Sequence, residues 1–206
     1  MQLTMYTGGM VSTNGYIIEL DDAIIVIDAP KGIAKHLEEK GLKATHLIIT
    51  HQHFDHIEDA LEVQQMADAK TYAMEAYNEA LSLTKTARSW GMAVDGLFFL
   101  VTDTISEGET LNISSLSFDV RHVPGHSPES LCFYLKNQGI IFVGDTLMAG
   151  GMGRHDFEYG DGVLLKKGIR EKILSLPPET VSLSGHGPHT TVGDELASNP
   201  YFSYKS

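Results

Sequence analysis

The run from Thr50 to His56 constrains this chain more than any other feature, because it holds three histidines and one aspartate within six positions. The run follows the apolar residues 47–49, which are typical of a buried strand. After such a strand the chain must turn sharply and present its polar side chains in one loop. Histidine and carboxylate are common ligands of zinc, iron and manganese. The run therefore predicts a metal site with the candidate ligands His51, His53, Asp55 and His56. Together with histidines elsewhere in the chain, this number of ligands suits two ions better than one.

Three other predicted strands also end in residues that bind metals. His122 follows an alternating stretch and precedes a Pro-Gly turn, while Asp145 and His186 each follow an apolar stretch that closes on glycine. Each residue alone has a plain structural explanation, as a turn residue, a cap or a solvated histidine. An unpaired buried carboxylate is costly, however, so Asp145 needs a cation or several donors. Four strand ends with such side chains together favour one metal site.

These motifs resemble those of the metallo-β-lactamase superfamily. The similarity rests on residues 51–56, 122–127, 142–147 and 185–188. Within the superfamily, residues 153–157 and 187–193 are most similar to glyoxalase II and its close relatives. The similarity extends over nearly the whole chain, from Asn14 to Asn199.

The resemblance implies an α/β fold with a single domain over residues 1–206. Its architecture would be a four-layered αβ/βα sandwich of two mixed β-sheets flanked by helices. It also implies two divalent metal ions, with zinc as the first expectation. Iron and manganese stay open, because such ligands accept all three metals. Residue by residue, His51, His53 and His122 would hold one ion, Asp55, His56 and His186 the other, and Asp145 would bridge them.

Two departures from the family pattern bear on the substrate. The family commonly has glycine after the histidine-rich run and after the Pro-Gly-His turn, where this chain has Glu58, Asp59 and Glu129. Glyoxalase II proper also has a C-terminal helical extension that helps to bind glutathione, and the sequence stops 20 residues after His186. We therefore expect a compact relative whose recognition of glutathione is open.

The expected reaction is hydrolysis of a small-molecule thioester such as S-lactoylglutathione. Water between two divalent ions becomes hydroxide near neutral pH, and Asp55 would orient this hydroxide or accept its proton. A thiol with a pKa of about 8.5 leaves as thiolate without a protonating acid, whereas an amide nitrogen leaves poorly. The motifs contain no obvious dedicated acid, which favours the thioester.

Several alternatives stay open. The motifs also resemble those of persulfide dioxygenases, which use a single iron. A β-lactamase is less favoured, because Asp145 stands where many of those enzymes have cysteine and no secretion signal is present. A nuclease is disfavoured by the net charge of −12 and by the lack of a basic stripe. A non-catalytic metal-binding protein would keep similar ligands but close every coordination position.

The composition, with 42% hydrophobic and 20% charged residues, is that of an ordinary globular protein. No apolar run approaches the length of a transmembrane helix and the N-terminus has no signal core, so we expect a cytoplasmic protein without a membrane or nucleic-acid partner. The oligomeric state is open. The single cysteine, Cys132, lies in an apolar stretch and is predicted to be a buried packing residue.

Periodicity places the motifs on expected elements. Residues 16–20 and 23–29 predict a hairpin, at whose end Asp28 is a candidate to orient a ligand histidine. Residues 45–49 and 71–73 predict strands. Helices are expected over 31–40, 57–67, 75–89 and 162–176, and mainly strands from 96 to 143.

Overall fold

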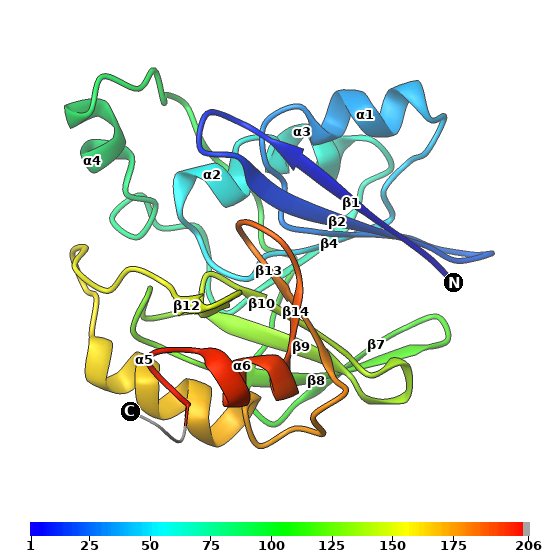
Figure 1. Cartoon of the computed structure of the whole chain (residues 1–206). Coiled ribbons are helices and arrows are strands. Elements are labelled where there is room, and N and C mark those ends of the chain that lie inside the picture. The colour runs from blue at the N-terminus through cyan, green and yellow to red at the C-terminus, as the bar shows by residue number, and fades with distance from the viewer. Residues whose placement is uncertain (204–206) are drawn as a thin grey trace. The chain divides into compact units, whose positions relative to one another are not determined.

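The computed structural model describes residues 1–203 and divides them into two compact units. The first unit is Met1–Ile105, and the second begins at Ser106. Each unit has its own six-stranded sheet and its own helices (Figure 1). Within the described residues, no helix is long and apolar enough to cross a bilayer.

The sheet of the first unit is mixed. Its strand order is β1-β2-β3-β4-β5-β6, with antiparallel pairs from β1 to β3 and parallel pairs from β3 to β6. The predicted hairpin is confirmed, because Glu19 of β2 pairs with Ile24 of β3. The strands are β1 (Gln2–Gly8), β2 (Thr13–Glu19), β3 (Ile24–Ile27), β4 (His46–Ile48), β5 (Lys70–Ala73) and β6 (Asp103–Thr104).

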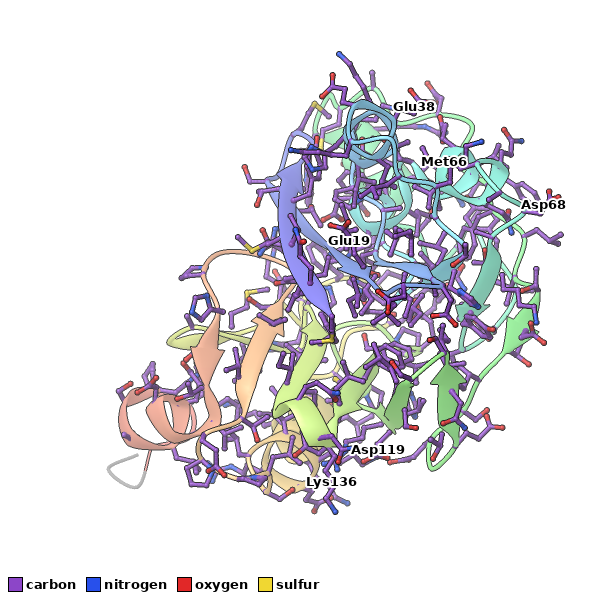
Figure 2. The ribbon with its side chains drawn as sticks, turned by 90° about the vertical axis from the view of Figure 1, so that its right-hand side faces the viewer. Glu19, Glu38, Met66, Asp68, Asp119 and Lys136 are labelled. Carbon is purple, nitrogen blue, oxygen red and sulfur yellow. The ribbon has the colours of Figure 1, made fainter. Side chains whose placement is uncertain are left out.

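Two of the helices of the first unit bury one apolar side against this sheet. Ile33 and Leu37 of α1 lie four residues apart, are fully buried and share a core cluster with Leu47 of β4. Figure 1 shows α1 and α3 beside the strands, and Figure 2 shows Glu38 on the outer side of α1, where it is exposed. The helices are α1 (Ile33–Glu39), α2 (Phe54–Ile57), α3 (Ala60–Gln65) and α4 (Thr84–Ser89).

The sheet of the second unit is also mixed. Its order is β14-β13-β10-β9-β8-β7, in which only the β10–β13 pair is parallel. The strands are β7 (Thr110–Ile113), β8 (Leu116–His122), β9 (Leu131–Leu135), β10 (Ile140–Gly144), β13 (Val181–Ser184) and β14 (Thr190–Thr191). A small separate hairpin joins β11 (Leu147–Met148) to β12 (Gly151–Met152).

The helices of the second unit pack on its sheet through a separate apolar core. Leu165, Ile169 and Ile173 are fully buried and cluster with Val143 of β10 and Cys132 of β9. The predicted helix over 162–176 is present as α5 (Gly162–Gly168), continued by the π-helical segment η2 (Ile169–Ile173). The remaining helical segments are η1 (Lys136–Gln138) and α6 (Val192–Ser198). The predicted α/β class with two mixed sheets is confirmed.

Two predicted helices are wrong in extent, for reasons that lie outside their own sequence. The expected helix over 57–67 is broken at Asp59, whose backbone N–H donates to the carbonyl of Ala29 and whose φ and ψ of −109° and 15° are not helical. The expected helix over 75–89 exists only as α4, because Leu83 adopts a left-handed φ of 56° just before it. Strand β1 was not predicted.

Candidate metal centre

The histidine-rich run forms a compact, buried cluster in the first unit. Strand β4 ends at Ile48, the chain stays extended at His53 (φ −58°, ψ 143°), and α2 begins at Phe54. The imidazole centroid of His51 lies 4.5 Å from that of His53 and 4.1 Å from that of His56. None of the four predicted ligands in the run is more than 6% exposed. The local sequence therefore gathers these side chains as predicted.

Asp28 supports this cluster from the end of β3. Its Oδ2 atom lies 2.8 Å from His56 Nδ1 and accepts from the hydroxyl of Thr50 at 2.7 Å, while its Oδ1 atom accepts from the backbone N–H of Thr50 at 2.8 Å. Asp28 is 2% exposed and adopts a left-handed φ of 57°, which is uncommon for a residue other than glycine. The expected contact of Asp28 with a histidine of the run is confirmed.

The hydrogen bonds assign the protons on two of the histidine rings. The hydroxyl of Thr50 donates to Asp28, so its oxygen accepts from His51 Nδ1 at 3.0 Å. The carboxylate of Asp28 likewise accepts from His56 Nδ1. Both rings therefore carry a proton on Nδ1. A neutral ring with its proton there keeps the lone pair on Nε2, which is how metal-binding histidines are usually held. This donor set fits a metal ion.

The second unit gathers a smaller set of ligand-type side chains. His126 Nε2 and His186 Nε2 lie 3.4 and 3.3 Å from the same carboxylate oxygen of Asp145. His126 is held through Nδ1, which donates to the carbonyl of Arg154 at 2.7 Å. Gly153 allows its backbone to lie close to that of Asp145, because a Cβ at residue 153 would lie 1.8 Å from the carbonyl oxygen of Asp145. Asp145 and His186 thus lie together as predicted, with His126 beside them.

Among the described residues, the groups suited to hold a metal ion include His126 and do not include the predicted His122. His122 is the last residue of β8, and its Nε2 donates to the carbonyl of Pro128 at 2.7 Å, so that nitrogen carries a proton. The Pro124-Gly125 turn, with a φ of 127° at Gly125, then carries the chain on to His126. The overlooked signal is the turn itself, because it places a second histidine, His126, four residues beyond the strand end.

The described side chains that fall into groups suited to hold a metal ion are His51, His53, Asp55, His56, His126, Asp145 and His186. They are the predicted residues with one replacement.

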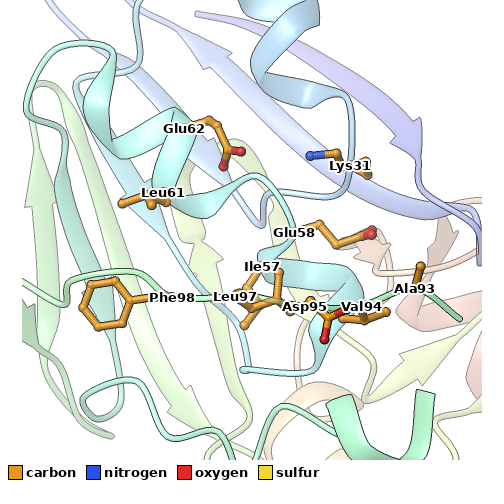
Figure 3. Close-up of a pocket in the computed structure, with 11 residues that line it drawn as sticks. Lys31, Ile57, Glu58, Leu61, Glu62, Ala93, Val94, Asp95, Leu97 and Phe98 are labelled. Carbon is orange, nitrogen blue, oxygen red and sulfur yellow. The ribbon is translucent and has the colours of Figure 1, made fainter. Parts of the chain in front are cut away.

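Two of the three acidic residues that depart from the family pattern, Asp59 and Glu129, have structural partners. Asp59 accepts from the backbone N–H groups of Gly32 and Ala34 and pairs with Lys31 at 2.8 Å. Glu129 is buried and accepts from the hydroxyl of Ser127. Glu58 lines a cavity of about 190 Å³ in the first unit, with Lys31 and apolar residues of 93–98 (Figure 3). Burial raises the pKa of Glu58.

Comparison with known proteins assigns the family. The sequence profile of the metallo-beta-lactamase superfamily matches residues 8–186. The chain is 35% identical over 202 residues to the probable metallo-hydrolase YqgX of Bacillus subtilis, covering 95% of this chain and 94% of that protein. It is 33% identical over 192 residues to the hydroxyacylglutathione hydrolase GloC of Haemophilus influenzae, covering 90% and 91%. The chain belongs to the metallo-β-lactamase superfamily and is a metallo-hydrolase of that group.

Solved structures agree with this assignment. The BLEG-1 B3 metallo-beta-lactamase has a TM-score of 0.87 and 31% identity, covering 97% of this chain and 99% of that one. TTHA1623 in a di-iron-bound form has a TM-score of 0.83 and 31% identity, covering 97% and 100%. The superfamily fold and a metal site of histidine and aspartate residues are therefore established, while the metal and the substrate are matters of proposal.

Proposed function

We propose that this protein is a thioesterase that hydrolyses acyl-thiol conjugates such as S-lactoylglutathione. The observation that carries the proposal is the buried set of histidines whose Nδ1 atoms are tied to Thr50, Asp28 and the Arg154 carbonyl. The likeness to a hydroxyacylglutathione hydrolase over most of the chain supports the thioester.

The proposed cofactor is a pair of divalent ions, zinc first and iron or manganese as alternatives. The likeness to a di-iron protein supports both the number and the possibility of iron. When bound, the ions would supply hydroxide at neutral pH and polarise the acyl oxygen. The proposed ligands are His51, His53 and His126 for one ion, Asp55, His56 and His186 for the other, and Asp145 for both.

In this proposal Asp55 also acts as the catalytic residue. It lies in the first turn of α2, and it is nearly buried, with His56 Nε2 3.5 Å from one carboxylate oxygen. A carboxylate in this position would orient the attacking hydroxide and accept its proton. The thiol product leaves as a thiolate and needs no acid from the chain.

The test combines elemental analysis of the purified protein with a substrate panel. We expect about two metal ions per chain and turnover of S-lactoylglutathione faster than that of an oxygen ester or a β-lactam. A protein that binds the metals but hydrolyses no thioester would refute the substrate, and a protein with no bound or bindable metal would refute the site.

A second candidate is β-lactam hydrolysis, which is favoured by the likeness to a B3 metallo-beta-lactamase. The substrate panel decides between the two candidates by comparing the hydrolysis rates of a β-lactam and a thioester. We expect the thioester to react faster, because an amide nitrogen needs a proton to leave and a thiolate does not. The persulfide dioxygenase alternative requires one iron and oxygen consumption with a persulfide substrate. An oxygen electrode in the same panel distinguishes it.

A further inference from the structure

Thr13 is a buried residue outside the histidine motifs that contacts the proposed catalytic carboxylate. It is the first residue of β2 and is 0% exposed. Its hydroxyl donates to Asp55 Oδ2 at 2.6 Å, across 42 residues of sequence. Both residues belong to the first unit. A hydroxyl that donates to a carboxylate at this distance makes a charge-assisted hydrogen bond, which is about twice as strong as a neutral one.

We propose that Thr13 is a positioning residue that fixes the rotation of the Asp55 carboxylate. The inference rests on the proposed function, since it assigns to Thr13 the control of a group that binds metal and handles the proton. The terminal torsion of aspartate has a broad energy profile, so the side chain does not set its own carboxylate plane. Threonine is stiff at χ1 and is held in a strand, so its hydroxyl is a rigid reference point.

The hydrogen bond also selects between the two carboxylate oxygens. Oδ2 receives the Thr13 hydroxyl and is the oxygen that lies 3.5 Å from His56 Nε2. Removal of the hydroxyl would remove the hydrogen bond that marks Oδ2 and would weaken this preference for one carboxylate orientation. Loss of such a supporting hydrogen bond typically lowers metal affinity or activity about 10- to 100-fold.

The test compares three variants. Thr13→Val keeps the branched shape and strand preference but removes the donor, while Thr13→Ser keeps the donor. Thr71→Val is the matched control: Thr71 is 0% exposed on β5 of the same sheet, and its hydroxyl bonds to Ala69 and Gln64 rather than to the proposed site. Zinc affinity is measured by competition with a chromophoric chelator, together with kcat, KM and the Tm of the metal-free protein.

For Thr13→Val we expect zinc affinity and kcat to fall about tenfold or more, with KM unchanged because Thr13 is not assigned to the substrate. Thr13→Ser should restore most of both, and Thr71→Val should leave both unchanged. Wild-type affinity and kcat in Thr13→Val, or equal losses in Thr71→Val, would overturn the inference. If the wild type binds zinc but hydrolyses no thioester, the substrate proposal fails. The role of Thr13 is then tested by the zinc affinities of the wild type and the variants alone. If the wild type binds no metal, both proposals fail.

Discussion

At the residue scale, the site depends on which nitrogen of each histidine is engaged by the protein. His51, His56 and His126 each use Nδ1 for a hydrogen bond to an oxygen, and in the proposed centre Nε2 would be the ligand atom. His122 instead uses Nε2 to reach the carbonyl of Pro128. His122 and His126 lie only four residues apart in the sequence, yet they use opposite ring nitrogens for their hydrogen bonds to the backbone.

His126 and His122 form a natural pair for mutation. We expect His126→Ala to lower zinc binding by about one ion per chain and to reduce kcat at least 100-fold, because removing a ligand costs more than the 10- to 100-fold of a supporting residue. His122→Ala should keep both metals and most of the activity. Elemental analysis and steady-state kinetics measure the two effects, and the reverse ranking would restore His122 as the ligand.

Cys132 provides a prediction about pH. It is fully buried on β9, and burial raises the pKa of its thiol to about 12. The raised pKa keeps the thiol protonated throughout the range from pH 7 to about 9, and only the thiolate reacts with a disulfide reagent. We expect no labelling of the native protein in this range and one thiol per chain in denaturant. Rapid labelling of the native protein would contradict the buried position.

At the element scale, one helix takes its cap from a distant residue. The N-cap of α1 is Gly32, which has no side chain and adopts a φ of 96°. Asp59, which is 3% exposed, accepts from the N–H groups of Gly32 and Ala34 at 2.7 and 3.2 Å. The first N–H groups of a helix have no partner within the helix, so this carboxylate stabilises α1 through tertiary contact.

Asp59→Ala should therefore destabilise the protein. Removal of the carboxylate leaves two N–H groups without their acceptor, and we expect a loss of about 1–3 kcal/mol in the free energy of unfolding. For a chain of this size that corresponds to a fall in Tm of about 2–12 °C. Glu38→Ala on the exposed side of α1 is the control and should change Tm by little. Equal Tm values for both variants would exclude the capping role.

At the scale of the whole molecule, each of the two units has its own core and its own set of ligand-type residues. The first contributes the cluster of the histidine-rich run, and the second contributes His126, Asp145 and His186. Both sets are among the proposed metal ligands.

Metal removal should therefore lower stability. A ligand that binds only the folded protein stabilises it by about 4 kcal/mol when its free concentration is 1,000 times its Kd. We expect the chelated protein to unfold at a lower temperature, with recovery on addition of zinc, and His126→Ala to lose much of this difference. Scanning calorimetry measures the effect. Identical Tm values with and without chelator would show that no ion is bound in the folded state.

Much of the fold and of the ligand set follows from local pattern. Apolar stretches predicted most of the strands, and six of the seven ligand-type positions lie within the histidine-rich run or directly after an apolar strand and its glycine. Strand β1 was missed because its apolar and polar residues do not alternate cleanly, as its mixed burial shows. The predicted helix over 75–89 is wrong in its first part, because Leu83 adopts a left-handed conformation that helix propensity does not predict, and α4 begins only after it.

The sequence alone determined the strand ends and the kinds of side chain that they present, because strand periodicity and ligand spacing are properties of neighbouring residues. Only the tertiary structure decided which histidine stands beside Asp145, that Asp59 caps α1, and that Thr13 holds Asp55. These choices depend on hydrogen bonds between residues far apart in the chain. Their partners become known only when the backbone has folded and brought them within bonding distance.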